Sequence, residues 1–336
     1  MLETFNGLQL EAMACALPNR TVEVASFAER FGEEAVERFR SVVGIHAFHI
    51  ADSDQTASDL AEAAARALIT AGRLDPTTVD LLLFVTQTPD SIAPATSALL
   101  QRRLGLREDI FALDLNLGCT GFLAGLLTAA HFLQNAAVHR VLLLGGDTLT
   151  RQVDPMDKTV AMLFGDAGFA AVIGKEGDAR WTIASATAGS DVITIPHHPP
   201  FFHMDGTAVF NFTVTRVPEQ IEQVLTATGD SPKTIDLLLL HQANAFIVRQ
   251  IARMTGFSEA QTPEALARYG NTSCASLPLL LCDLSQAGMK GLCHSLLSAF
   301  GVGLSWITCQ MDVDFSRCLP IVLIPPHTHT LPQELQ

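Results

Sequence analysis

Apolar runs of strand length alternate along the first half of the chain with segments of helical period. Thr56 to Ala71 carries apolar residues at helical spacing, and Val79 to Val85 forms a buried-strand run. Further strands are predicted over Ile110 to Leu117 and Val141 to Leu144, with a helix that begins near Cys119. Such alternation is typical of an α/β protein.

The second half repeats this alternation after Trp181. Its predicted elements are helices around Val217 to Leu225, after Ala243 and after Thr272, and strands over Ile235 to Leu240, His294 to Ala299 and Leu304 to Gln310. Two predicted strands have similar sequences, each with an aspartate as the second residue of an apolar run: Val79-Asp80-Leu81-Leu82-Leu83-Phe84 and Ile235-Asp236-Leu237-Leu238-Leu239-Leu240. Each also follows a proline-containing turn. This self-similarity predicts a duplicated fold, with one half over residues 1–175, a second over 176–312 and an extension over 313–336.

The composition narrows the class of protein. A chain of 336 residues, 48% hydrophobic and 17% charged, can bury a large core. Its formal net charge of −14 argues against nucleic acid as a partner, since phosphate binding needs a basic surface. The longest apolar stretch, Cys119 to Leu133, is too short and too interrupted to predict membrane insertion.

The cysteines and the N-terminus indicate a reducing compartment. Seven scattered cysteines do not form a disulfide framework, and no CxxC pair suggests zinc. The first residues lack the basic and apolar regions of a signal peptide. We therefore expect a cytoplasmic location, where a reactive thiol stays free.

Cys119 is the candidate nucleophile, since it follows a strand and opens a helix. Backbone N–H groups and the helix dipole at such a position favour the thiolate, which predicts a lowered cysteine pKa. A buried structural cysteine is the competing interpretation.

Three further segments are candidates for a site that also contains Cys119. His241 follows a buried strand, Asn271 lies in a turn before a helix, and Phe300-Gly301-Val302-Gly303 is a glycine-rich loop. Each alone fits a structural role. Together, a thiol, an imidazole, an amide and exposed backbone N–H groups supply what thioester chemistry requires.

At these residues the chain resembles the β-ketoacyl-acyl-carrier-protein synthase III group of thiolase-fold condensing enzymes. The resemblance extends over roughly Val43 to Gln310 and predicts an α/β thiolase fold, in which duplicated βαβ halves form a five-layer αβαβα sandwich. The motifs that carry it are Gly44-Ile45, Thr56-Ala57-Ser58-Asp59-Leu60-Ala61, Thr88-Pro89-Asp90, Gly118-Cys119-Thr120-Gly121-Phe122, Phe164-Gly165-Asp166-Ala167-Gly168, Met204-Asp205-Gly206-Thr207-Ala208-Val209-Phe210, His241-Gln242-Ala243-Asn244 and Gly270-Asn271-Thr272-Ser273.

The resemblance implies a role for each candidate residue. Cys119 would take an acyl group from a thioester, and His241 and Asn271 would stabilise the enolate formed when a malonyl thioester loses carbon dioxide. That carbanion would attack the acyl-cysteine in a Claisen condensation. The backbone N–H groups of Cys119, Val302 and Gly303 would form the oxyanion hole. No metal and no cofactor beyond acyl-CoA or acyl-carrier protein and malonyl-carrier protein would be needed.

Departures from the family pattern concern the acyl donor. Val42, Arg38, Lys158 and Phe246 stand where the family usually has residues that hold the adenine and phosphates of coenzyme A. Their replacement predicts weak binding of coenzyme A. Acyl-CoA and a carrier-bound primer both remain possible donors at this point.

Other residues are assigned by the same resemblance to the acyl pocket and to carrier binding. Ala93 stands where a phenylalanine usually closes the partner's pocket, which leaves room for a longer or bulkier chain. The pocket assignment also includes Phe122 and Phe210, and the carrier-binding assignment includes Lys158, Phe246, Asn244, Arg249 and Arg253. Arg249 and Arg253, one helical turn apart, suit either an acidic carrier protein or a solvated helix face.

Three function classes remain open: a decarboxylative condensing enzyme, an acyltransferase that passes the acyl group to an oxygen or nitrogen nucleophile, and a non-catalytic subunit of a heterodimeric synthase. An intact set of Cys119, His241 and Asn271 favours the first. We expect a homodimer. The loosely spaced His197, His198 and His203 indicate a surface loop rather than a metal site.

Overall fold

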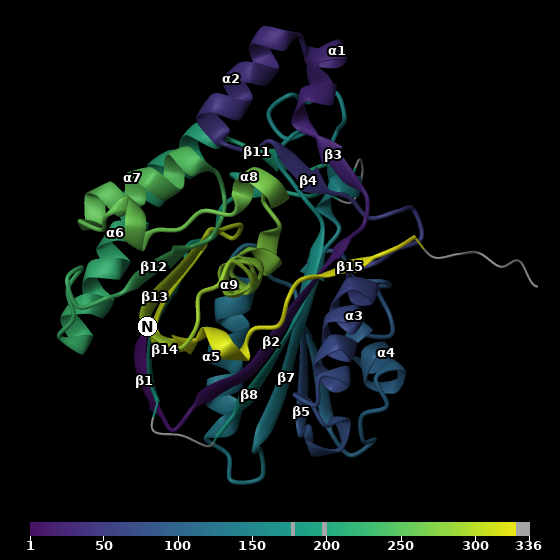
Figure 1. Ribbon diagram of the computed structural model, residues 1–336, viewed down its shortest axis with the longest axis vertical. Coiled ribbons are helices and arrows are strands. Elements are labelled where there is room, and N and C mark those ends of the chain that lie inside the picture. The colour runs from purple at the N-terminus through teal and green to yellow at the C-terminus, as the bar shows by residue number, and fades with distance from the viewer. Residues whose placement is uncertain (176–178, 197–199, 327–336) are drawn as a thin grey trace, which may run out of the picture.

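The structure, a computed structural model, describes residues 1–175, 179–196 and 200–326 and contains two large β-sheets (Figure 1). The six-stranded sheet has the order β15 (Val322–Ile324), β2 (Gln9–Pro18), β8 (Ala167–Gly174), β7 (Arg140–Asp147), β5 (Leu81–Val85), β6 (Phe111–Leu115). The five-stranded sheet has the order β1 (Leu2–Asn6), β9 (Arg180–Thr187), β14 (Ser305–Asp314), β13 (Leu292–Gly301), β12 (Leu237–Leu240). Two short ribbons pair β3 (Thr21–Glu23) with β4 (Ala47–His49) and β10 (Ile193–Thr194) with β11 (His203–Met204).

Helices form three layers around these sheets. The middle layer contains α5 (Gly121–Leu133) and α9 (Ser276–Gln286), which pack between the two sheets and are apolar over most of their surface, as helices largely enclosed by other elements must be. The outer layers contain α3 (Ala57–Thr70) and α4 (Thr96–Arg103) on the six-stranded sheet, and α6 (Gly206–Thr228) and α7 (Ala245–Thr255) on the five-stranded sheet. The predicted five-layer αβαβα sandwich is confirmed.

The two sheets repeat one topology. In the first, β5 runs parallel to β7, which pairs antiparallel with β8 and then β2; in the second, β12, β13, β14 and β9 follow the same sequence of directions. Asp80 and Asp236, the acidic residues of the two similar segments, make equivalent hydrogen bonds. The carboxylate of Asp80 accepts the backbone N–H of His139 at 2.8 Å, and that of Asp236 accepts the N–H of His294 at 2.8 Å. The sequence repeat therefore reflects a structural duplication.

The ends of the chain cross between the sheets. β1 pairs with β9 in the five-stranded sheet, although its residues precede the rest of the first half. β15 pairs with β2 in the six-stranded sheet, so the segment expected as an extension adds a strand to the first half. β14 continues through residue 312 to Asp314.

Helix α6 is longer than the stretch predicted around Val217 to Leu225. The Asp205 carboxylate caps its first turn by accepting the N–H groups of Thr207 and Ala208, and Gly229 ends it in the left-handed conformation. The capping residue Asp205 lies well before the apolar stretch Val217 to Leu225. The spacing of apolar residues alone therefore placed the start of the helix too late.

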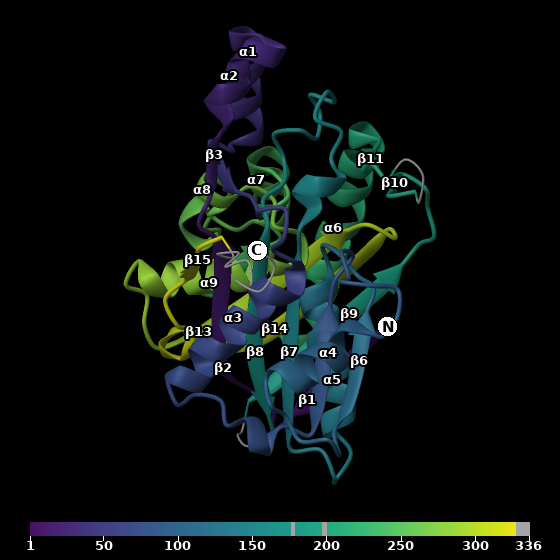
Figure 2. The ribbon, with the colours of Figure 1, turned by 90° about the vertical axis from the view of Figure 1, so that its right-hand side faces the viewer.

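Smaller helices complete the fold. They are α1 (Ala28–Phe31), α2 (Glu33–Val43) and α8 (Leu266–Tyr269), with 3-10 turns between them and elsewhere. Figure 2 shows α1 and α2 projecting from one end of the molecule. All seven cysteines are free thiols. Across the described residues, no helix combines the length and apolarity needed to cross a membrane.

His294 provides a test of the packing at the start of β13. Its ring contacts Asp312 at 2.6 Å and Asp230 at 3.2 Å. Burial lowers the pKa of His294, but the hydrogen bonds and charges of Asp312 and Asp230 outweigh it, so the pKa lies above its ordinary value. The stabilisation is therefore complete below the unfolded pKa and is lost as pH rises through the folded one. We expect His294→Gln to lower the denaturation midpoint more at about pH 6 than at about pH 9.

The exposed His203→Gln variant is the control for this test and should show no such pH dependence. A deficit of His294→Gln that is equal at both pH values would contradict the proposed contribution of the charged histidine.

Candidate active site

Cys119 lies in the turn between β6 and α5. The turn closes with a 2.7 Å hydrogen bond from the Gly121 N–H to the Gly118 carbonyl, directly before the helix. The hydroxyl of Thr120 contacts that of Ser305 at 2.8 Å, which ties the turn to the start of β14 in the other half. The predicted placement of Cys119 at a helix start is thus observed.

The loop between β13 and β14 closes over the sulfur. A Cβ atom added to Gly301 would lie 2.6 Å from the Sγ of Cys119, so only glycine permits this approach. Gly301 and Gly303 have φ angles of 159° and 135°, whereas Val302 is not among the positive-φ residues. The two glycines supply the positive φ angles of the loop, so Val302 keeps an ordinary backbone conformation.

His241 follows directly on β12 and is 1% exposed. Its Nδ1 lies 2.6 Å from the hydroxyl of Ser276, the first residue of α9. Its ring meets Phe300 edge to face, with 5.6 Å between centroids. Burial lowers the pKa of His241 to about 3, so the imidazole is neutral at physiological pH.

Asn271 is held between α8 and α9. Its backbone N–H donates to the Leu163 carbonyl at 2.9 Å and its carbonyl accepts from Gly165 at 3.1 Å, which fixes it beside the Phe164 segment. Its side-chain oxygen accepts the Ser273 N–H at 3.0 Å. The amide NH₂ group has no hydrogen-bond partner among the described residues.

Neighbouring positions of β13 bring Cys119 and His241 together. Phe300 contacts the ring of His241, and the next residue, Gly301, lies against the sulfur of Cys119. On the Asn271 side, a Cβ atom added to Gly121 would lie 3.1 Å from the Cβ of Cys274. The thiol comes from one half of the duplicated fold, and the imidazole and amide come from the other.

The expectation of a lowered cysteine pKa is wrong. Burial raises the pKa of Cys119 to about 11, and the negative charge of Asp147 acts in the same direction. Hydrogen bonds from the backbone of Val302 and of Cys119 itself only partly offset this. Desolvation of the thiolate therefore outweighs the favourable field of the helix start. The resting group is a thiol.

That Asp147 lies near Cys119 was not predicted from the sequence. Asp147 ends β7, is 1% exposed, and accepts hydrogen bonds from the Gln87 N–H at 2.7 Å and the Thr86 hydroxyl at 3.1 Å. Burial raises its own pKa. The sequence signal that could have identified Asp147 is an acidic residue at the end of a predicted buried strand. Asp147 belongs to no motif that would have drawn attention to it.

The residues assigned to the acyl pocket have different positions. Phe122 is buried in the core between the sheets, edge to face with Phe169 at 5.4 Å, which favours a packing role. Ala93 is exposed in the loop before α4. Phe210 stacks on Phe246 with 5.4 Å between centroids, and Phe246 is 52% exposed.

The residues assigned to carrier binding also differ in their surroundings. Asn244 caps α7 by accepting the Ile247 N–H at 2.8 Å. Arg249 donates twice to Glu264, at 2.8 and 3.0 Å, so its charge is already paired. Arg253 is exposed and makes no ion pair with another described residue, and Lys158 is exposed. Arg249, Arg253 and Glu264 line a surface cavity of about 690 Å³.

Within the described residues, no cluster of three or more histidine, cysteine, aspartate or glutamate side chains could hold a metal ion. His197 and His198 lie outside the described residues, and His203 begins β11.

Comparisons with known proteins show the family of the chain. The model of 3-oxoacyl-[acyl-carrier-protein (ACP)] synthase III matches residues 113–192, and the model of its C-terminal domain matches residues 225–312. Beta-ketoacyl-[acyl-carrier-protein] synthase III of Streptococcus suis (strain 05ZYH33) is 35% identical over 328 residues, 92% of this chain and 99% of that protein. The chain belongs to the β-ketoacyl-acyl-carrier-protein synthase III family. It is thus related to condensing enzymes of the transferase class.

Solved structures agree with this membership. A 3-oxoacyl-(acyl-carrier protein) synthase from Burkholderia xenovorans LB400 superimposes with a TM-score of 0.93 at 30% identity, covering 96% of this chain and 99% of that chain. The priming β-ketosynthase of the R1128 polyketide pathway has a TM-score of 0.81 at 25% identity, covering 94% and 97%. Fatty-acid and specialised-metabolite synthases therefore both occur among the similar structures.

The raised thiol pKa predicts how Cys119 reacts. Alkylation by iodoacetamide, followed at the Cys119 peptide by mass spectrometry, should accelerate about tenfold per pH unit from about pH 7 to 10 without a plateau. Asp147→Asn removes a negative charge, so it should lower the thiol pKa and accelerate alkylation at about pH 8 by about threefold to tenfold. The exposed Asp109→Asn variant is the control and should leave the rate unchanged. A plateau below about pH 8 in the unmodified protein would show that the thiol is already activated.

Proposed function

We propose that the protein catalyses acyl transfer to Cys119 followed by decarboxylative Claisen condensation with a malonyl thioester. The observation that carries this proposal is that two neighbouring residues of β13 contact the reacting groups: Phe300 touches the imidazole of His241, and Gly301 lies against the sulfur of Cys119. Buried Asn271, with its unused amide donor, adds the second hydrogen-bonding group.

In the first step, the sulfur of Cys119 attacks the carbonyl carbon of an acyl thioester. The proton of the thiol moves to His241 as the carbon–sulfur bond forms, because a separated thiolate and imidazolium are unfavourable at these pKa values. The backbone N–H groups of Cys119 and the Val302–Gly303 loop stabilise the tetrahedral oxyanion, each donor contributing about 3 kcal/mol in other acyl-transfer enzymes. The departing thiolate takes the proton back.

In the second step, the malonyl thioester loses its carboxylate as carbon dioxide, and the electron pair moves into an enolate. His241 Nε2–H and the Asn271 amide donate to the enolate oxygen. The carbanion carbon then attacks the acyl carbonyl, and the sulfur of Cys119 leaves as a thiolate that takes a proton from water. Because enolate charge is spread over two donors, the reaction needs no metal or cofactor.

Ser276 suits both steps. A serine hydroxyl can donate to Nδ1 of His241 or accept from it, so each tautomer of the ring finds a partner across the 2.6 Å contact. A bare Nε2 takes the thiol proton in the first step, and a protonated Nε2 donates to the enolate in the second.

Acyl transfer to an oxygen or nitrogen nucleophile is the alternative reaction, and the ordered Asn271 favours condensation over it. We expect Asn271→Ala to acylate Cys119 at a nearly normal rate but to slow carbon dioxide release by about 10²-fold or more, since only the second step uses this donor. Intact-mass spectrometry and carbon dioxide release measure the two steps separately.

The exposed Asn211→Ala variant is the control. An acyl adduct of the unmodified protein that releases no carbon dioxide from a malonyl thioester would support the other acyltransferase. The absence of any adduct would support a non-catalytic subunit.

We further propose that the acyl group reaches Cys119 on a carrier protein. Where the family usually binds coenzyme A, this chain presents Phe246, half exposed and stacked on Phe210, and the exposed Val42 of α2. At these two positions the apolar surface gives the charged phosphates of coenzyme A no partner. Arg253, which makes no ion pair with another described residue, supplies a positive charge for an acidic carrier.

Matched acyl-CoA and acyl-carrier donors test this assignment. We expect loading of Cys119 from the carrier to be at least about tenfold faster, and Phe246→Arg to accelerate loading from coenzyme A by restoring a phosphate partner. Phe246→Leu, which removes the ring without adding charge, is the control. Equal or faster loading of the unmodified protein from coenzyme A would contradict the proposal.

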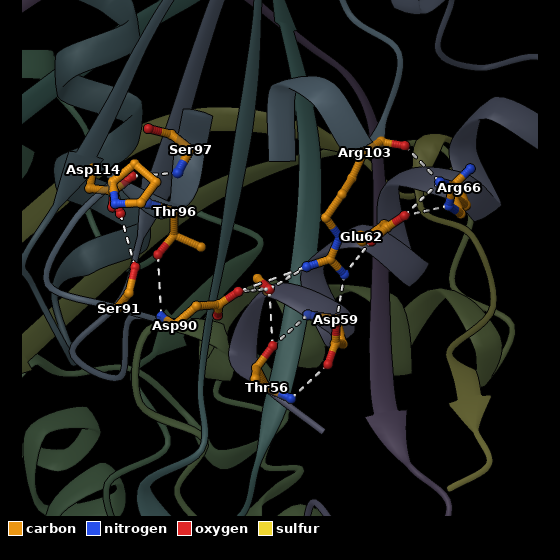
Figure 3. Close-up of polar contacts among 12 residues, drawn as sticks. Thr56, Asp59, Glu62, Arg66, Asp90, Ser91, Thr96, Ser97, Arg103 and Asp114 are labelled. Atoms are coloured by element: carbon orange, nitrogen blue, oxygen red, sulfur yellow. Dashed lines mark hydrogen bonds and ion pairs between the residues drawn. The ribbon is translucent and has the colours of Figure 1, made fainter. Parts of the chain in front are cut away.

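We propose a homodimer formed along β6, in a cytoplasmic setting that suits the free thiols. β6 is an edge strand of the six-stranded sheet (Figure 2), and Phe111 at its start is 56% exposed. The neighbouring loop exposes Ile92 fully. Asp90 anchors that loop by accepting the Ser58 hydroxyl at 2.7 Å and pairing with Arg103 at 3.8 Å (Figure 3).

A further inference from the structure

A cavity of about 620 Å³ adjoins the turn that carries Cys119. Gln87 and Val302, both of which line it, also touch the turn. A Cβ atom added to Gly118 would collide with the side-chain oxygen of Gln87 and lie 3.1 Å from Cγ1 of Val302. A group attached to the sulfur of Cys119 therefore has this space beside it.

Three carboxamide side chains line the cavity from three different segments: Gln87 after β5, Asn116 after β6 and Gln152 at the end of the turn 149–152. None of the three makes a side-chain hydrogen bond to another described residue. The oxygen of Gln152 is fully buried and has no partner there. A buried carbonyl oxygen without a partner is costly, so its usual explanation is a ligand or water that supplies a donor.

The described lining of the cavity offers no free charge. Asp114 is the charged residue among those that line it, and its two oxygens accept the backbone N–H groups of Thr96 and Ser97 at 2.7 Å each, at the start of α4 (Figure 3). No lysine or arginine belongs to the described lining. An anionic group bound here would lose its hydration without gaining a cation.

The rest of the described lining is largely apolar. Ile193 and Ile195 come from β10 and the segment after it, and Pro89 comes from the loop after Gln87. Such a surface suits a carbon skeleton, while the carboxamides supply both donors and acceptors along it.

We infer that the acyl group carried by Cys119 is an uncharged, oxygenated acyl chain, with a hydroxyl, oxo or amide substituent that hydrogen-bonds to Gln87, Gln152 and Asn116. This inference rests on the proposed function, since it specifies the acyl donor of the same reaction. A plain alkyl chain would cover these carboxamides without satisfying them, and a carboxylate-bearing chain would be unpaired.

Single-turnover acylation with matched donors tests the inference. N-acetylcysteamine thioesters of hexanoate, of the isomeric hydroxyhexanoates and of adipate share a six-carbon chain and differ in one substituent, and intact-mass spectrometry follows the adduct on Cys119. We expect the best hydroxylated isomer to load at least about tenfold faster than hexanoyl, the ratio that one hydrogen bond of about 1.4 kcal/mol gives, and adipoyl to load slowest.

Gln87→Met and Gln152→Met keep the length of each side chain and remove its polar groups. We expect each to reduce the preference for the hydroxylated donor to about twofold or less, mainly by slowing that donor and not hexanoyl. Gln223→Met, on the exposed face of α6, is the matched control and should keep the preference.

Three results would count against the inference. Hexanoyl loading as fast as every hydroxylated isomer would overturn it and leave the proposed function intact. Variants that keep the preference but weaken self-association would show that the carboxamides serve a second copy of the chain. The absence of an adduct from any donor, acetyl included, would reject the proposed function and this inference with it.

Discussion

The close approach of Gly301 to Cys119 is the contact on which the site depends. Any side chain at position 301 would occupy the place of the sulfur, 2.6 Å from the added Cβ. The same strand sets the imidazole, because Phe300 packs against the ring of His241. The hydrogen bond between Thr120 and Ser305 then joins the nucleophile turn to the next strand. One hairpin of the second half thus determines where the Cys119 thiol of the first half can lie.

The duplicated topology explains why this meeting is possible. Each half contributes one helix to the middle layer, and both helices begin near the site: α5 directly after Cys119, and α9 at Ser276, which holds His241. Two equivalent helix starts between two sheets bring residues more than a hundred positions apart into one place. The asymmetry arises in the residues that each half places there, a thiol on one side and an imidazole and an amide on the other.

Periodicity predicted the elements whose burial repeats along the chain, such as α3, β5 and β12, and the motifs predicted which residues gather at the site. The exchange of β1 and β15 between the sheets was not predictable, because edge pairing leaves no local pattern. The Cys119 pKa was predicted with the wrong sign. The helix start is visible in the sequence, whereas the enclosure of the thiol and the charge of Asp147 arise from segments that meet only in the fold.

The neutral resting pair suits a reaction that passes through a carbanion. An imidazolium beside the enolate would be a strong acid, and it would protonate the carbanion before the new carbon–carbon bond formed. Burial that lowers the pKa of His241 to about 3 removes this acid while the ring keeps one N–H to donate. The same burial raises the thiol pKa of Cys119 to about 11, which slows the first step. In the proposed reaction, a site that protects a carbanion in its second step therefore has a less reactive nucleophile in its first.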